Sequence, residues 1–175
     1  MRKIIAYLAT SADGFIARPD GGVDWLDRPR PPGNYGMGAF LRSVDTVVMG
    51  RTTFDIGVKF GQGVWPGKRT IVLSRTMPID SVEGAVIESG DVGKLAERLR
   101  AEDGKDIWVM GGNAVFSAFL DAGALDELII HVVPVLIGTG IPLLDAKART
   151  NELELKSTRK FSDGVVRLHY VVKRA

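Results

Sequence analysis

Residues 107–116 read IWVMGGNAVF and place an apolar run, two glycines and a helix pattern in direct succession. A second stretch, TVVMGRTTF at residues 46–54, joins a β-branched run to a helix start through one glycine. Apolar runs that alternate with helix patterns predict strands of a parallel sheet, with helices on both of its faces. These two junctions therefore decide the predicted fold class, which is α/β.

The rest of the chain extends the same pattern. Further strands are predicted at 3–9, 70–73 and 85–88, and helices at 37–44, 92–101 and 113–121. Asp91 is suited to cap the helix at 92–101. Three long strands follow at 127–135, 152–161 and 165–173, and Ser162-Asp163-Gly164 predicts a hairpin between the last two. We expect a mostly parallel central sheet flanked by helices, with a C-terminal antiparallel hairpin, in a single domain over residues 1–175.

The composition restricts the class of function. Hydrophobic residues make up 45% and charged residues 25%, as in ordinary globular proteins. The net charge of +2 comes from scattered side chains, so no nucleic-acid partner is expected. The apolar run near residue 1 is too short for a signal peptide or a membrane span. The chain has no cysteine, which fits a reducing cytoplasm and excludes thiolate chemistry.

The two histidines give no sign of a metal site. His131 and His169 lie in separate apolar runs, and no cysteine is present to complete a ligand set. We expect both to be ordinary strand residues and predict no metal.

Three predicted strands end in turns that suit phosphate. These turns are Gly50-Arg51-Thr52, Leu73-Ser74-Arg75 and Gly111-Gly112-Asn113. Glycine allows a ligand to approach the backbone, and a following helix N-terminus offers N–H groups to an anion. For each turn alone, an ordinary tight turn or a solvated arginine is the better interpretation. Because the three turns come at successive strand ends, together they favour a dinucleotide site, although the Rossmann and Walker motifs are absent.

Several segments resemble the dihydrofolate reductase-like superfamily, in the right order along nearly the whole chain. The similarity is greatest to the branch of the riboflavin-biosynthesis reductase, the C-terminal domain of a bifunctional deaminase–reductase. The segments that carry it are ATSADGFIA from Ala9, VMGRTTF from Val48, VLSR from Val72, VMGG from Val109, LDEL from Leu125, Pro134 and GTGIPL from Gly138.

The resemblance implies an NADPH-dependent oxidoreductase and assigns cofactor-binding roles. Ala9 and Ile16 would bracket the nicotinamide, and Leu73, Ser74 and Arg75 would hold the adenine and the 2′-phosphate. The pyrophosphate would lie between two groups of residues: Gly50, Arg51, Thr52 and Thr53, and Gly111, Gly112, Asn113, Ala114, Val115 and Phe116. The resemblance also implies a cis peptide bond between Gly111 and Gly112, and a homodimer.

The substrate side should come from the loop at 11–36, which is long for a compact domain and rich in Gly, Pro and Asp. Its candidates for proton delivery and substrate contact are Asp13, Asp24, Trp25 and Asp27. The alternative for Asp13 is capping the Asp-Gly turn, and loop carboxylates such as Asp24 are usually solvated.

The resemblance favours 5-amino-6-(5-phosphoribosylamino)uracil, or a similar small heterocycle, as the substrate. True dihydrofolate reductases carry a buried carboxylate on the helix after the first loop, whereas residues 33–43 (GNYGMGAFLRS) contain none. Two alternatives stay open: a dihydrofolate reductase-like activity, and a pyridine-nucleotide-binding protein without catalysis.

Overall fold

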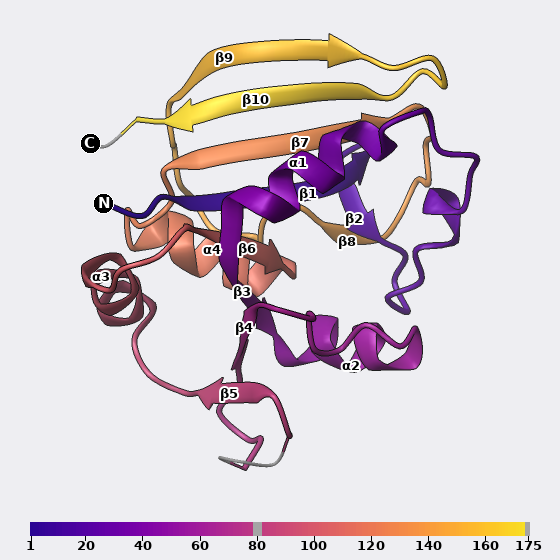
Figure 1. Cartoon of the computed structure of the whole chain (residues 1–175). Helices are drawn as coiled ribbons and strands as arrows, with labels where there is room; N and C mark the ends of the chain where they lie inside the picture. The colour runs from indigo at the N-terminus through magenta and orange to yellow at the C-terminus, as the bar shows by residue number, and fades with distance from the viewer. Residues whose placement is uncertain (79–81, 174–175) are drawn as a thin grey trace.

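The computed structural model describes residues 1–78 and 82–173. Eight strands form one mixed sheet in the order β5-β4-β3-β6-β1-β7-β10-β9 (Figure 1). Neighbouring strands from β5 to β7 run parallel, whereas β10 is antiparallel to both β7 and β9. The prediction of a mostly parallel sheet with a C-terminal antiparallel hairpin is confirmed.

The strands of the large sheet are β1 (Ile4–Ser11), β3 (Val44–Gly50), β4 (Arg69–Leu73), β5 (Ala85–Glu88), β6 (Asp106–Gly111), β7 (Glu127–Val133), β9 (Leu153–Lys160) and β10 (Val166–Val172). The helices are α1 (Met37–Ser43), α2 (Arg51–Lys59), α3 (Val92–Ala101) and α4 (Asn113–Asp121). No helix within the described residues is both long and apolar enough to cross a membrane.

Alternate residues of the central strands face opposite sides of the sheet, and each side is covered by two helices. On one side, Ala6 and Val48 pack in a cluster with Leu99 of α3 and Phe119 of α4. On the other side, a second cluster contains Tyr7, Met49 and Trp108, with Phe40 of α1 and Phe54 of α2. The strands are buried on both faces, which explains their nearly continuous apolar sequences.

The loop at residues 11–36 contains more structure than we predicted. Its short strand β2 (Phe15–Ala17) pairs with β8 (Ile141–Pro142), and two 3₁₀ turns follow at Asp24–Leu26 and Asn34–Gly36. The partner strand is about 125 residues away in the sequence, so no local pattern could reveal the pairing. The small sheet fixes the loop beside the end of β1.

The parallel strands bring their carboxyl ends to one edge of the sheet. Register places Gly50 beside Leu73, and Met49 beside Gly111. In Figure 1, β1 and β7 end on the right, on the side that carries β2 and β8. The predicted phosphate turns therefore share one edge of the sheet.

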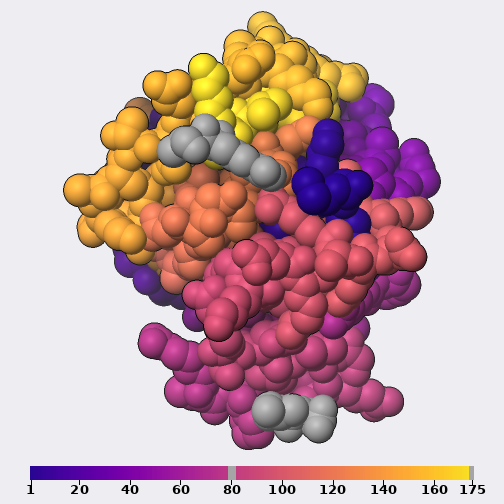
Figure 2. Space-filling model, turned by 90° about the vertical axis from the view of Figure 1, so that its left-hand side faces the viewer, coloured from indigo at the N-terminus to yellow at the C-terminus, as the bar shows by residue number. Residues whose placement is uncertain are grey.

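Figure 2 shows the C-terminal hairpin, in yellow and orange, at one end of the molecule, opposite the magenta segment that contains β5.

Candidate functional site

The two glycine junctions that indicated the fold lie against each other. A Cβ atom on Gly50 would lie 3.1 Å from Val115 Cγ2 and 3.9 Å from the backbone nitrogen of Gly112. A Cβ atom on Gly112 would lie 3.4 Å from Thr53 Oγ1 and 3.9 Å from Ile16 Cδ1. Larger side chains would fill this space, so the glycines leave backbone exposed where α2 and α4 begin. The resemblance assigns this cradle to the pyrophosphate.

The helix N-termini at this cradle have N–H groups to offer. The residues that precede α2 and α4 are glycines, and neither helix has a side-chain capping hydrogen bond from them. In α3, by contrast, the Asp91 side chain accepts from the backbone N–H of Lys94 at 2.9 Å, as predicted. Apart from the N–H of Ala114, which Asn113 Oδ1 accepts, the first N–H groups of α2 and α4 have no side-chain acceptor among the described residues, which favours a bound anion.

The peptide bond between Gly111 and Gly112 is cis, in agreement with the resemblance, and Gly111 has a φ of 115°. Residues with a side chain rarely adopt this backbone conformation, which explains why a glycine occupies that position. Asn113 accepts the N–H of Ala114 through its own side chain at 2.8 Å, and Phe116 packs into the core.

The turn after β4 provides the second part of the predicted cofactor site. Ser74 Oγ accepts from the backbone N–H groups of Thr76 and Met77, at 3.3 and 3.0 Å, so it holds the turn. Arg51 donates to Thr76 Oγ1 at 3.1 Å and thereby connects α2 to the same turn. Arg75 is exposed, and no partner for its side chain is found in the described part of the chain.

Leu73 lines a hollow of about 220 Å³. The other lining residues come from the end of β5 and the start of α3: Glu88, Gly90, Asp91, Lys94, Leu95 and Arg98. The hollow lies directly after the carboxyl ends of β4 and β5, next to the residues that the resemblance assigns to the adenine. Leu73 and Leu95 give the hollow apolar side chains, whereas its two cations, Lys94 and Arg98, are matched by Asp91 and Glu88, and Arg98 forms an ion pair with Glu88.

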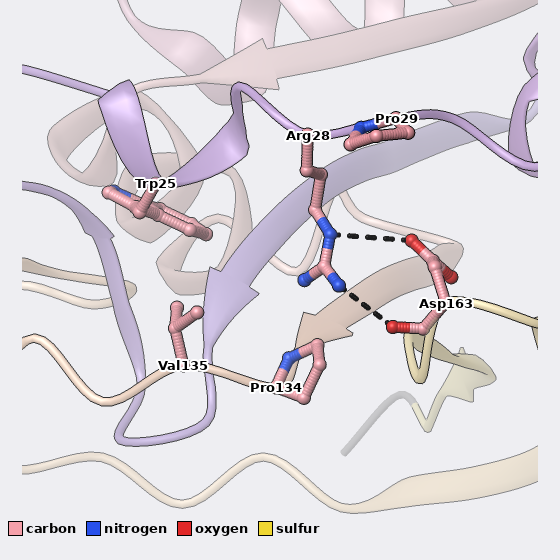
Figure 3. A pocket seen from close by; sticks show the side chains of 6 residues that line it. All are labelled: Trp25, Arg28, Pro29, Pro134, Val135 and Asp163. Atoms are coloured by element: carbon pink, nitrogen blue, oxygen red, sulfur yellow. Dashed lines mark hydrogen bonds and ion pairs between the residues drawn. The ribbon is translucent and has the colours of Figure 1, made fainter.

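A pocket of about 360 Å³ lies past the ends of β1 and β7 (Figure 3). Trp25, Pro29, Pro134 and Val135 give it apolar walls, and Arg28 and Asp163 provide its polar groups. Figure 3 shows Arg28 and Asp163 facing each other, with a hydrogen bond of 2.8 Å from Arg28 Nη2 to the Asp163 carbonyl.

This pocket adjoins the end of β1, where the nicotinamide is predicted. Ala9 packs against the apolar cluster that contains Trp25 and Val133. The backbone N–H of Ala12 donates to the carbonyl of Val135 at 2.8 Å. The pocket is therefore a candidate for the substrate, and Trp25, predicted as a site residue, forms part of its wall.

Asp13 connects the first loop to the segment that follows β7. Its carboxylate accepts from the backbone N–H groups of Gly138 at 2.7 Å and Ile137 at 3.1 Å. A hydrogen bond with the Ser11 hydroxyl, together with these two, lowers the pKa of Asp13 below its ordinary value. The carboxylate is ionised and engaged, which suits a residue that positions the loop.

The other loop carboxylates lie on the surface. Asp24 forms two hydrogen bonds with Arg18, at 2.5 and 2.8 Å, and this arginine lowers the pKa of Asp24. Asp27 is exposed. In residues 1–78 and 82–173, no three histidine or carboxylate side chains come together as a metal site requires.

A buried polar group lies in the sheet beside the end of β1. His131 lies opposite Ala9 in the sheet, and its ring is 4.7 Å from that of Tyr7 and 5.8 Å from that of Tyr35. Burial lowers the pKa of His131 to about 4 and raises that of Tyr7 to about 12, so both are neutral at pH 7. Tyr35 donates to Asp163 Oδ2 at 2.5 Å.

His131 lies in β7, in agreement with the prediction of a strand residue.

Comparison with known proteins identifies the relatives of this chain. The model of the RibD C-terminal domain family matches residues 2–167. The chain is 38% identical to YwjB, an uncharacterized protein of Bacillus subtilis strain 168, over 97% of this chain and 98% of that protein. A second uncharacterized protein of the same strain, YyaP, is 34% identical over 97% of this chain and 94% of its own length.

Solved structures show the same architecture. A putative riboflavin biosynthesis protein from Shewanella sp. PV-4 has a TM-score of 0.86 at 30% identity, over 98% of this chain and 99% of that one. A Thermotoga maritima diaminohydroxyphosphoribosylaminopyrimidine deaminase/5-amino-6-(5-phosphoribosylamino)uracil reductase has a TM-score of 0.73 at 17% identity, which supports a common fold. The similarity covers 98% of this chain and 57% of the Thermotoga chain.

Proposed function

The chain belongs to the RibD C-terminal domain family, and we propose that it is an NADPH-dependent reductase that transfers hydride to a small heterocyclic substrate. The relatives support a reductase of the riboflavin-pathway type. The cofactor, the substrate and the assignment of individual residues are our proposal.

One observation carries the proposal more than any other. Gly50 and Gly112, each directly before a helix, lie against each other at the carboxyl edge of the sheet. The turn after β4 and the end of β1 lie along the same edge, on either side of this cradle. An extended ligand with several anionic groups fits such a row of sites.

The residues present would hold a dinucleotide as follows. Backbone N–H groups at the starts of α2 and α4 would take the pyrophosphate. Arg75 is exposed next to the Leu73 hollow and would take the 2′-phosphate, which favours NADPH over NADH. Ala9 and Ile16 would hold the nicotinamide between the cradle and the substrate pocket. NADPH, when bound, supplies the hydride.

The substrate pocket would orient the acceptor and exclude water. Trp25 and Val135 give it apolar walls, and the Asp13 carboxylate fixes the segment after β7 that forms its rim. Asp13 and Asp24 are engaged by hydrogen bonds and ionised at pH 7, so we propose that they position the loop rather than deliver a proton.

For the substrate we propose a pyrimidine similar to 5-amino-6-(5-phosphoribosylamino)uracil. The helix α1 offers no carboxylate for a pteridine, because its sequence from Met37 to Ser43 contains neither Asp nor Glu. An amino-pteridine would therefore lack a partner for its donors, which disfavours dihydrofolate as substrate.

The decisive experiment follows NADPH oxidation at 340 nm with each of the two candidate substrates. We expect turnover with the pyrimidine and none with dihydrofolate. Efficient reduction of dihydrofolate, with inhibition by methotrexate, would refute the substrate assignment. NADPH binding without oxidation of either substrate would favour a non-catalytic nucleotide-binding protein.

We also propose that the chain forms a homodimer through its C-terminal hairpin. The edge strand β9 is exposed along its whole length and carries Leu153 and Leu155, with 40% and 54% of their surfaces exposed. A second copy would cover this unpaired edge.

A further inference from the structure

A group of arginines surrounds the aromatic residues beside the substrate pocket. Tyr35, Phe161 and His131 form its centre, with ring centroids 5.1 Å apart for Tyr35–Phe161 and 6.2 Å apart for His131–Phe161. The arginines that contact this centre or act on it electrostatically are Arg28, Arg30, Arg159 and Arg167. We call these four residues the arginine cluster.

Within the described residues, only one carboxylate is paired with this cluster. Asp163 forms an ion pair with Arg28 at 3.4 Å and accepts the hydroxyl of Tyr35. Arg159 and Arg167 have no carboxylate within ion-pair distance in residues 1–78 and 82–173. Four cations and one anion leave this region with an excess of about three positive charges.

Arg167 is the member whose state most needs an explanation. Its Nε atom is buried and has no hydrogen-bond partner among the described residues. The guanidinium lies against the backbone of Gly36, where a Cβ atom would be 3.3 Å from Arg167 Nη1. A buried guanidinium donor without an acceptor costs free energy, and an acceptor atom of a ligand would remove this cost.

The position of Arg167 in the sheet adds a second unfavourable contribution to the free energy of the folded protein, which is electrostatic repulsion. It lies directly opposite Arg159 on β9 and opposite His131 on β7. Two like charges in facing positions of neighbouring strands repel each other. The same guanidinium also disfavours the charged form of His131, in addition to the effect of burial.

We propose that Arg167, supported by Arg28, binds a phosphate group on the substrate. A phosphate monoester carries close to two negative charges and three acceptor oxygens, which matches two guanidinium groups better than a single carboxylate would. Arg28 and Asp163 line the pocket and pair with each other, and Asp163 accepts the hydroxyl of Tyr35. Arg167 lies against Gly36, the residue that follows Tyr35 in the chain.

The inference rests on the proposed reductase function only in calling the ligand a substrate. The phosphate site is distinct from the proposed pyrophosphate cradle, because it is formed by β10 and the first loop and not by α2 and α4. A test must therefore separate the two anion sites.

The experiment measures binding of ribose 5-phosphate and of ribose to the whole protein by calorimetry at constant ionic strength. The variants are Arg167→Met, which keeps an unbranched apolar side chain, and Arg51→Met at the cradle. The control is Arg42→Met, which removes an exposed arginine at the end of α1. NADPH binding is measured on the same samples by fluorescence.

We expect ribose 5-phosphate to bind the wild type and ribose not to bind. Arg167→Met should weaken this binding by about tenfold or more and leave NADPH binding unchanged, and Arg42→Met should change neither. Because Arg167 has no hydrogen-bond or ion-pair partner among residues 1–78 and 82–173 and faces Arg159, the Arg167→Met protein should melt at a temperature no lower than the wild type.

Three results would overturn the inference. They are equal binding of ribose and ribose 5-phosphate, loss of phosphate binding in Arg51→Met but not in Arg167→Met, and strong destabilisation by Arg167→Met. Failure of the wild type to bind NADPH would refute the proposed function instead, while the comparison between Arg167→Met and Arg42→Met would still decide the phosphate site.

Discussion

Replacing Glu127 by Gln should destabilise the protein in a pH-dependent way. Glu127 begins β7, its side chain is only 8% exposed, and it binds Lys3 at 2.7 Å, Lys156 at 3.0 Å and His169 at 2.7 Å. These partners come from the N-terminus, β9 and β10, so one carboxylate connects the C-terminal hairpin to the parallel sheet. Burial opposes ionisation, but the three hydrogen bonds outweigh it and lower the pKa of Glu127 from 4.5 to about 2.

The magnitude follows from the difference in proton affinity between the folded and unfolded chains. This pKa displacement corresponds to about 3 kcal/mol of stability at pH 7. Lys3 and Lys156 are about half exposed, and water screens their charges, so we expect a loss of about 2 kcal/mol for Glu127→Gln. The folded-state pKa is the lower one, so this stability is present above pH 4.5 and is lost as the pH falls towards 2.

Urea denaturation of the wild type and of Glu127→Gln, at several pH values between 7 and 3, measures the difference in their unfolding free energies. The difference in unfolding free energy should stay constant down to pH 5 and shrink below pH 4.5. Glu154→Gln, which changes an exposed carboxylate on β9, is the control and should cost less than about 0.5 kcal/mol. A difference below about 0.5 kcal/mol at pH 7 for Glu127→Gln, or one that does not change with pH, would refute the reasoning.

Four further predictions test the proposed site. Arg75→Ala should weaken NADPH binding by about one to two decades and leave NADH nearly unchanged in fluorescence titrations, and equal losses would remove the 2′-phosphate assignment. Gly50→Ala places a methyl group 3.1 Å from Val115 Cγ2, so it should fold, as circular dichroism would show, but bind NADPH about tenfold more weakly; unchanged affinity would contradict the cradle. Asp13→Asn should lower kcat/KM without altering the pH–rate profile above pH 5, because the Asp13 pKa lies below its ordinary value; loss of a titrating limb there would make Asp13 the proton donor instead. Light scattering at micromolar concentration should give the mass of a dimer, and a Leu155→Lys variant on β9 should give a monomer; a monomeric wild type would exclude the proposed pairing.

Much of the fold could be predicted because its signals are local. The apolar runs before Gly50 and Gly111 gave strands, the following residues gave helices, and Ser162-Asp163-Gly164 gave the hairpin. Strands buried on both faces have continuous apolar sequences, and alternation with helices implies parallel neighbours. The positions of the candidate cofactor turns could be predicted for the same reason, since each turn directly follows a strand.

The candidate substrate pocket was harder to predict from the sequence, because its residues come from distant segments of the chain. Trp25 belongs to the first loop, Pro134 follows β7, and Asp163 lies in the C-terminal hairpin, yet all three line one pocket. The sequence suggested Asp13 and Asp24 as proton donors. It could not show that the carboxylate of Asp13 accepts from the backbone of Gly138 and that the carboxylate of Asp24 accepts from Arg18.

The amino-acid sequence by itself determined the order of strands and helices and the glycine turns at the strand ends, because both depend on neighbours along the chain. Only the tertiary structure decided which charged side chains of the described residues are paired and which are not. Arg167 and Glu127 are ordinary charged residues of predicted strands, but register places Arg167 between Arg159 and His131, and Glu127 among Lys3, Lys156 and His169. Pairing across a sheet joins residues that are remote in sequence, and burial then fixes whether each charge is balanced or left for a ligand.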